Sequence, residues 1–183
     1  MASDSTQSNS TIALQAKLWQ AAHLSGRFKL RAGGVSSEYF DKYRFESHPA
    51  LLREISEELV PLLPPDENFL GALELGGVPI GTVVSQLSGR ELRLVRKAAK
   101  SYGTELQVEG GPTKGHKITV VEDVATSGRS IIDGVEALRA SGAVVKTAIC
   151  VVDREQGGTE ALAEIDVKLV PLFFLSQMQI AAL

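Results

Sequence analysis

Residues 117–131 read KITVVEDVATSGRSI, in which a run of β-forming residues meets two adjacent carboxylates and then a turn of small and hydroxyl-bearing residues. The apolar run predicts a buried strand. The stretch that follows, GRSIIDGVEALRASG, has the apolar spacing of an amphipathic helix. In a sheet with helical crossovers, Glu122 and Asp123 would lie at the carboxyl end of their strand, where ligands bind.

The turn between this strand and helix predicts an anion site. Backbone N–H groups at a helix N-terminus can surround a phosphate, and Thr126, Ser127 and Ser130 add hydroxyl donors. The two carboxylates before the turn could accept hydrogen bonds from neighbouring hydroxyls of a ribose. A simpler alternative stays open, in which one of the hydroxyls caps the helix and the carboxylates complement its dipole.

Strand and helix patterns alternate on both sides of this stretch. Such alternation predicts an α/β fold with a central parallel sheet flanked by helices, because parallel strands need a crossover. We expect helices at 11–23, 48–63, 78–89 and 128–142, and strands at 68–75, 91–95, 117–122 and 144–153.

Length and charge narrow the class of protein. The polar start MASDSTQSNST predicts a disordered tail over residues 1–10. With 183 residues and 44% hydrophobic content, the chain predicts a single domain over 11–183. A net charge of -3 gives no general attraction for nucleic acid or an anionic membrane, so we expect neither as a partner. The lone Cys150, inside TAICVVD, predicts a buried structural thiol, and we expect a cytoplasmic protein.

The stretch VVEDVATSG resembles the motif by which type I phosphoribosyltransferases bind phosphoribosyl pyrophosphate (PRPP). Neither G-x-x-x-x-G-K-[ST] nor G-x-G-x-x-G occurs in the chain. The resemblance implies that Glu122 and Asp123 contact the ribose hydroxyls. It also implies a 5′-phosphate loop made of Ala125, Thr126, Ser127, Gly128, Arg129 and Ser130.

A cationic segment, LVRKAAKSYGT, follows the strand at 91–95. It resembles the R-K-x-x-K-x-H-G loop of orotate phosphoribosyltransferases, which implies a mobile catalytic loop, 96–116, shared across a homodimer. Fixed cations there would stabilise the pyrophosphate as it leaves. The resemblance implies a catalytic set of Arg96, Lys97, Lys100, Tyr102 and Asp123, with Tyr102 where the family has His. Without a neighbouring phosphate site, the three cations would be a solvated strand end.

Two further segments suggest where a base would bind. FKLRAGGVSSEYFD, residues 28–41, resembles the family's F-x-L-x-S-G-x-x-S-x-x-Y-x-D segment, with Ala32 in place of Ser, and VVDREQGG resembles its D-R-x-x-x-G. The resemblance implies a small hood formed mainly by residues 11–45 and the C-terminal segment, and orotate contacts from Arg31, Tyr39, Phe40, Thr126 and Arg154. From the residues alone, Tyr39 and Phe40 could equally be core residues, and Asp153 and Arg154 could form a surface ion pair.

Gly76 and Gly77, between a strand and a helix, resemble the family's pyrophosphate loop. Some relatives carry a Lys near Gly76, so we expect cationic help here to come from the catalytic loop or from a metal. We expect no protein-bound metal, because His23, His48 and His116 lack ligand spacing and are interpreted as structural or surface residues. Mg²⁺ would then arrive on the phosphates of PRPP.

Together the resemblances imply transfer of a phosphoribosyl group from PRPP to orotate, giving orotidine 5′-phosphate. Three alternatives remain open at this point. The chain could act on another base, such as a purine; it could be a PRPP-binding regulator without turnover; or it could be a weakened relative, since Ala32, Gly76 and Tyr102 depart from the family pattern.

Overall fold

The computed structural model describes residues 9–29, 33–100 and 106–181. Its centre is a six-stranded sheet in the order β5-β4-β3-β6-β7-β8, in which β5 alone runs antiparallel to its neighbour. The strands are β3 (Phe69–Leu73), β4 (Glu91–Val95), β5 (Val108–Glu109), β6 (Ile118–Ala125), β7 (Thr147–Asp153) and β8 (Lys168–Phe174). The predicted fold class, a mainly parallel sheet flanked by helices, is confirmed.

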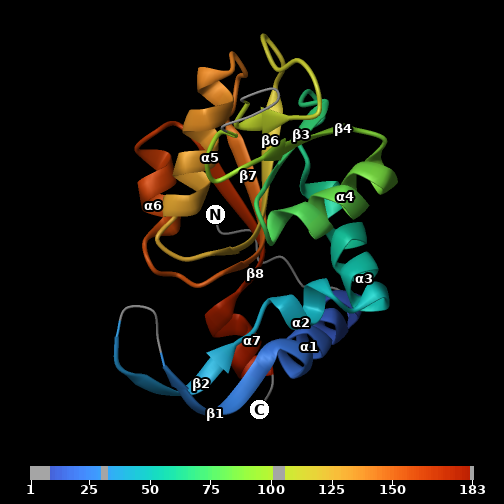
Figure 1. Cartoon of the computed structure of the whole chain (residues 1–183). Helices are drawn as coiled ribbons and strands as arrows, with labels where there is room; N and C mark the ends of the chain where they lie inside the picture. Colours follow the sequence, from blue (N-terminus) through green and yellow to red (C-terminus); the bar gives the residue numbers. More distant parts are fainter. Residues whose placement is uncertain (1–8, 30–32, 101–105, 182–183) are drawn as a thin grey trace, which may run out of the picture.

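Helices cover both faces of the sheet, as Figure 1 shows. Val121, Ile149 and Val151 pack into one core with α3 and α4, whereas Val120 and Cys150 pack into a second core with α5 and α6. Alternate residues of β6 and β7 therefore serve opposite faces, which is why these strands are almost continuously apolar. The helices are α3 (Pro49–Leu59), α4 (Gly77–Ser88), α5 (Arg129–Ala140) and α6 (Gly158–Ala163).

Strand β6 is longer than the sequence predicted. The predicted strand stopped at Glu122, but Val124 and Ala125 continue the parallel ladder against Val152 and Asp153 of β7. The acidic pair therefore lies inside β6, just before its last two residues, rather than beyond the end of the strand. The neighbouring strand supplies the hydrogen bonds that keep this segment extended.

A smaller layer lies beyond the carboxyl ends of the strands, at the bottom of Figure 1. We call it the hood and define it as α1 (Asn9–Ala22), β1 (His23–Lys29), β2 (Val35–Phe40), α2 (Tyr43–Glu46) and α7 (Leu175–Ala181). The β1–β2 hairpin was not expected from the sequence. Helix α1 begins at Asn9, inside the range predicted as a tail, whose first eight residues lie outside the described ones.

Short features complete the fold. A 3-10 turn, η1 (Val60–Leu62), follows α3, and the predicted loop 96–116 contains the two-residue strand β5. Cys150 is completely buried, and burial raises the pKa of its thiol well above the usual value, in agreement with a structural role. Among the described helices, none is long and apolar enough to cross a bilayer.

Candidate functional site

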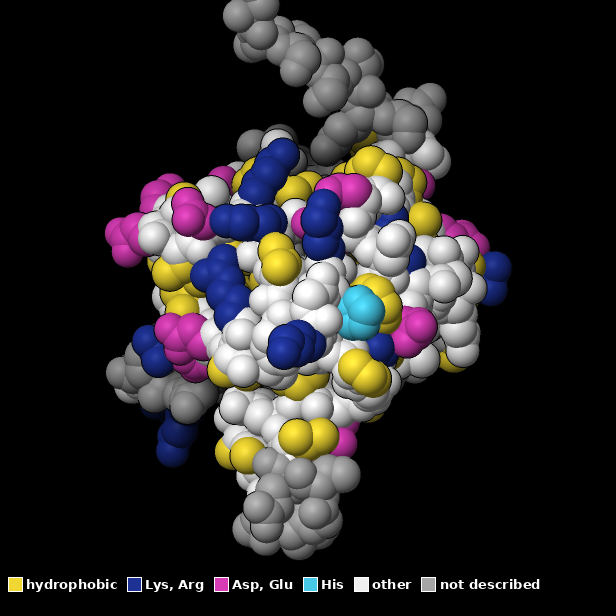
Figure 2. All heavy atoms as spheres, turned by 90° about the horizontal axis from the view of Figure 1, so that it is seen from above, with side chains coloured by type: hydrophobic (Ala, Val, Ile, Leu, Met, Phe, Trp, Pro, Cys, Tyr) yellow, Lys and Arg dark blue, Asp and Glu magenta, His cyan; other side chains and the backbone are white. Residues whose placement is uncertain are grey.

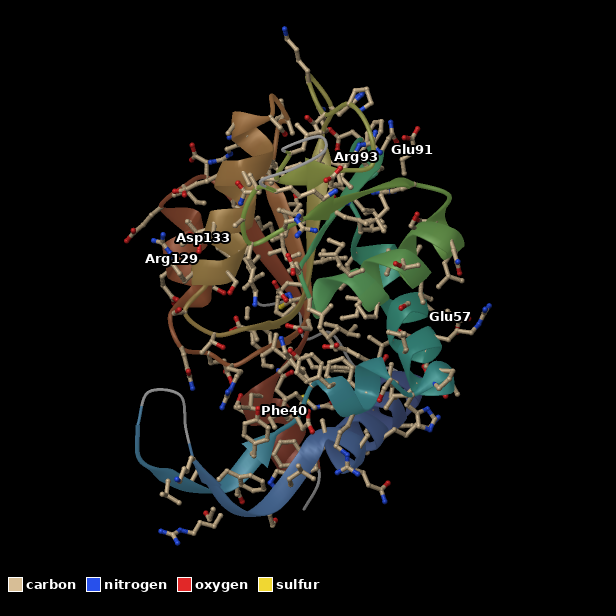
Figure 3. All side chains as sticks on the ribbon, viewed as in Figure 1. Phe40, Glu57, Glu91, Arg93, Arg129 and Asp133 are labelled. Atoms are coloured by element: carbon tan, nitrogen blue, oxygen red, sulfur yellow. The ribbon has the colours of Figure 1, made fainter. Side chains whose placement is uncertain are left out.

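The carboxyl edge of the sheet, on the side of β3, β4 and β6, holds a cavity of about 470 Å³, called the crevice below. Parallel strands in an open sheet place their ligands at this edge. Figure 3 labels Arg129 and Asp133, which lie on one flank of the crevice on α5 and are joined by an ion pair of 2.8 Å. The crevice is lined by Leu73, Glu74, Val95, Arg96, Lys97, Gln107, Ser127, Arg129, Ser130, Asp133 and Gly134.

The predicted phosphate loop closes around a second, smaller cavity of about 80 Å³, lined by residues 124–131. Gly128 adopts φ +77° at the start of α5, and a Cβ there would lie 3.1 Å from the Gly158 carbonyl oxygen, so the turn requires glycine. The N-cap residue of α5 is Gly128, and no side chain of the described residues makes a cap hydrogen bond there. The alternative that a hydroxyl of this loop serves as the helix cap is therefore wrong, and the first residues of α5 belong to the segment that lines this cavity.

The acidic pair is buried beside this loop. Glu122 is 6% exposed and Asp123 is 1% exposed, and neither lines the crevice. Burial, reinforced by the charge of Asp123, raises the pKa of Glu122 well above its usual value. Burial also acts to raise the pKa of Asp123, but hydrogen bonding to Glu122 and the ammonium of Lys42 outweigh it, so that pKa is lowered. Asp123 is thus the ionised member of the pair.

Sequence reasoning missed two residues, Lys42 and Glu46, that lie against Asp123. We call these two residues together with Glu122 and Asp123 the acidic centre. Lys42, in the hood just after β2, places its Nζ 2.5 Å from Oδ2 of Asp123. Glu46, on α2, is buried against the same carboxylate, and burial together with the hydrogen bond to Asp123 raises the pKa of Glu46 to about 8. No local pattern indicated either residue, because each meets Asp123 across about 80 positions of sequence.

The Gly76–Gly77 turn lies directly against β6. A Cβ on Gly76 would lie 1.4 Å from Oδ2 of Asp123, and one on Gly77 would lie 2.4 Å from the Val121 carbonyl oxygen. Neither position can hold a side chain in this arrangement. Sequence reasoning looked for a cation near Gly76 in the catalytic loop or in a metal; the structure also places Lys42 of the hood close to this turn, through its ion pair with Asp123.

The cationic segment after β4 divides between two environments. Arg96 and Lys97 line the crevice, and the Lys97 backbone N–H donates to Glu74, which lies at the end of β3. Lys100 instead pairs with Glu109 of β5, with 2.5 Å between Nζ and Oε1. Two predicted site residues, Tyr102 and Arg31, lie outside the described residues.

The two aromatic residues predicted to meet the base have different surroundings. Phe40 packs inside the hood, with its ring 6.3 Å from that of Phe45 and 6.4 Å from that of Trp19 (Figure 3). Its surroundings are those of the core alternative. Tyr39 points the opposite way, is exposed, and stacks on Phe28 at 5.4 Å.

Arg154 follows β7 and is held by its backbone N–H, which donates to the Ala125 carbonyl at 2.9 Å. Asp153 accepts hydrogen bonds from the Glu155 N–H and the Thr159 hydroxyl, and in the described part of the chain no ion pair joins it to Arg154. The buried Nε of Arg154 has no acceptor among the described residues. The surface ion-pair alternative therefore fails, and Arg154 keeps a donor for another partner.

The three histidines occupy structural positions. His23 stacks on Trp19, His116 stacks on Phe69, and Nδ1 of His48 accepts the Leu51 N–H at the start of α3. Within residues 9–29, 33–100 and 106–181, no group of three or more His, Cys, Asp or Glu side chains could hold a metal ion.

Comparison with known proteins identifies the family of the chain. The model of the phosphoribosyl transferase domain matches residues 45–171. The orotate phosphoribosyltransferase of Nocardioides sp. is 44% identical over 92% of this chain and 94% of its own, and that of Halobacterium salinarum is 42% identical over 84% and 87%.

Solved structures agree with the sequence relatives. The orotate phosphoribosyltransferase of Aeropyrum pernix is 34% identical, with a TM-score of 0.79 over 89% of this chain and 94% of that one. That of Mycobacterium tuberculosis H37Rv, in complex with PRPP, is 25% identical, with a TM-score of 0.79 over 93% and 99%. On these matches and on the loop, turn and strand geometry described above, the chain belongs to the orotate phosphoribosyltransferases, within the phosphoribosyl transferase domain family.

Proposed function

We propose that this chain transfers the 5-phosphoribosyl group of PRPP to N1 of orotate, releasing pyrophosphate and giving orotidine 5′-phosphate for pyrimidine biosynthesis. The observation that carries the proposal is the pair of adjoining cavities at the carboxyl edge of the sheet. One is enclosed by the loop 124–131 and suits the 5′-phosphate. The other is lined by Arg96 and Lys97 and suits the more highly charged pyrophosphate.

The chemistry requires charge stabilisation rather than a nucleophilic side chain. As pyrophosphate leaves C1 of the ribose, positive charge develops on the sugar and negative charge on the leaving group. Arg96, Lys97 and Lys100 neutralise the leaving group, with Tyr102 donating a hydrogen bond to it, and the loop and the acidic pair keep the sugar aligned. Lys100 must leave Glu109 to do so.

The sugar is assigned to the acidic pair of β6, and the base to Arg154 and the hood. Glu122 and Asp123 accept hydrogen bonds from the ribose hydroxyls, which requires the groups that now bury Asp123 to move aside. The free Nε of Arg154 supports a charge-assisted contact with the orotate carboxylate. Arg31, Tyr39 and Thr126 complete the proposed base site, and Phe40 supports it from the hood core.

Magnesium is assigned to PRPP rather than to a protein cage. The crevice presents cations together with only isolated carboxylates, Glu74 and Asp133, and this donor set fits a metal ion held mainly by phosphate oxygens and water. When bound, Mg²⁺ adds neutralising charge to the pyrophosphate.

We further propose a cytoplasmic homodimer whose loop 96–116 reaches the partner's site. Leu75 after β3, Leu94 in β4 and Leu106 in the loop itself are exposed apolar side chains that such an interface would cover. The face at the end of the sheet away from the hood carries Lys and Arg side chains interspersed with Asp and Glu (Figure 2). Such a mixed pattern offers no support for a nucleic-acid surface on that face.

The test is a spectrophotometric assay of the purified protein with Mg²⁺ and PRPP. Loss of the ultraviolet absorbance of orotate, dependent on both PRPP and Mg²⁺, is the expected result. Adenine, guanine, hypoxanthine and uracil run in parallel identify a different base. Measurable PRPP binding without turnover of any base would overturn the transfer reaction in favour of a PRPP-binding regulator or an inactive relative.

A further inference from the structure

Lys42 stands at the junction between the hood and the sheet. It follows β2 and precedes α2, and its ammonium forms an ion pair with Asp123 of β6. The two partners differ sharply in exposure, since the Lys42 side chain is 33% exposed and the Asp123 side chain is 1% exposed. A ligand arriving at the site therefore meets the ammonium before it meets the carboxylate.

The ammonium also lies beside the Gly76–Gly77 turn. The Asp123 oxygen that binds Lys42 is the same atom that a Cβ on Gly76 would strike. Neither residue of the turn carries a charge, so Lys42 supplies the positive charge at this point of the site. Its three N–H donors allow it to contact an anion without being fully released from Asp123.

Glu46 is the third side chain at this point. It is 7% exposed and packs on the Asp123 carboxylate above Gly76. The charged groups around it are Asp41 and Lys42, which precede α2, and Asp123 on β6. Because the pKa of Glu46 is raised to about 8, first by burial and then by Asp123, Glu46 is protonated at neutral pH and donates a hydrogen bond to Asp123. Asp123 therefore keeps one donor when Lys42 turns elsewhere.

We propose that Lys42 binds the pyrophosphate group of PRPP, and that its ion pair with Asp123 is the resting position of this cation in the ligand-free protein. The inference rests on the proposed function, because it adds a contact, from outside the lining of the crevice, to the pyrophosphate of the same substrate. When pyrophosphate attracts the ammonium, Asp123 is released to accept a hydrogen bond from the ribose, while it keeps the one hydrogen bond that Glu46 donates. Binding of PRPP thereby involves the hood directly.

Calorimetric titration of three ligands tests this assignment: PRPP, pyrophosphate and ribose 5-phosphate, each with Mg²⁺. Lys42→Met should weaken PRPP and pyrophosphate on the order of 10- to 100-fold, the range for a lost hydrogen bond to a charged group. Ribose 5-phosphate should change by no more than about twofold, because it lacks the group that Lys42 contacts. Lys42→Arg should recover most of the loss by restoring the charge.

The matched control is Lys117→Met, which removes another lysine in an ion pair, with Asp66 at 2.6 Å, from an exposed site. Its affinities should equal those of the unaltered protein. If Lys42→Met bound pyrophosphate as tightly as the control does, the proposal would be overturned. It would also be overturned if Lys42→Met lost as much affinity for ribose 5-phosphate as for pyrophosphate, because Lys42 would then only support Asp123. A protein that binds PRPP through Lys42 but never consumes orotate would refute the transfer reaction and leave this assignment standing.

Discussion

At Gly76 a single hydrogen atom faces the carboxylate of Asp123. A methyl group there would overlap Oδ2 and also approach Oε1 of Glu46 at 2.9 Å. Gly76→Ala must therefore displace either the turn or the acidic centre, and we expect it to lower the free energy of unfolding by about 1–3 kcal/mol and to weaken PRPP binding. Chemical denaturation and calorimetry measure the two effects. Gly26→Ala, whose new methyl meets only the tip of the Phe28 ring, is the control and should change neither quantity appreciably.

Glu46 makes the stability of the ligand-free protein depend on pH. Its pKa is about 8 in the folded chain and near the ordinary 4.5 when unfolded, so the folded state holds this proton more tightly. The stabilisation is fully present below the unfolded pKa and is lost as pH rises through about 8. Glu46→Gln keeps a neutral donor on Asp123 at every pH. We expect its melting temperature, relative to the unaltered protein, to rise steadily from about pH 5 to about pH 8.

The control for this series is Glu57→Gln, which alters an exposed carboxylate paired with Arg53 on α3 (Figure 3 labels Glu57). Its melting temperature should follow that of the unaltered protein at each pH. If the difference in melting temperature between Glu46→Gln and the unaltered protein stayed constant across the series, Glu46 would already be ionised near neutrality. The assignment of a proton between Glu46 and Asp123 would then be wrong.

Hydrogen bonds join the loop after β7 to α7, the last helix of the hood. The Glu155 carboxylate accepts hydrogen bonds from both the N–H and the hydroxyl of Ser176, at 2.9 and 3.0 Å, at the start of α7. Glu155 adopts φ +57°, so this contact fixes an uncommon backbone turn next to Arg154. Glu155→Ala should therefore raise the KM for orotate about three- to tenfold and leave PRPP affinity unchanged.

Steady-state kinetics with each substrate varied in turn separates these effects. Glu160→Ala, on the neighbouring α6 and exposed, is the matched control and should alter neither constant. If Glu155→Ala changed the KM for PRPP instead, the loop would belong to the sugar or phosphate site rather than to the base.

Elements set by local patterns were predictable from the sequence, and those set by distant contacts were not. Strand β4 matches its predicted bounds, and α4 begins within one residue of its prediction, because apolar runs and glycine punctuation are local signals. The end of β6 depends on its pairing with β7. The β1–β2 hairpin carries a local turn signal in Gly33 and Gly34, but its mostly exposed strands lack the apolar alternation that would indicate them. In the site, the phosphate loop is contiguous and was found, whereas Lys42 and Glu46 join Asp123 only through the fold.

The acidic centre lies between the central sheet and the hood. The sheet supplies Asp123 and the glycine turn, and the hood supplies Lys42, Glu46 and, through α7, support for the loop of Arg154. The proposed substrate sites therefore lie where the hood meets the carboxyl edge of the sheet. Changes in the position of the hood should alter phosphate and base binding together, even though each site uses different residues.

The proposed sharing of loop 96–116 between protomers predicts complementation. Lys100→Ala removes a cation from the loop, and Asp123→Asn impairs the site on β6, so each homodimer should lose most activity. If the loop crosses the interface, a mixed dimer contains one site with both defects and one site with neither. Random mixing makes about half of the dimers mixed, so about a quarter of all sites regain both groups. Activity of the mixture, measured by orotate consumption after subunit exchange, should approach that fraction of the unaltered protein. A mixture no more active than its parents, with mixed dimers verified by mass, would mean that each loop serves its own protomer.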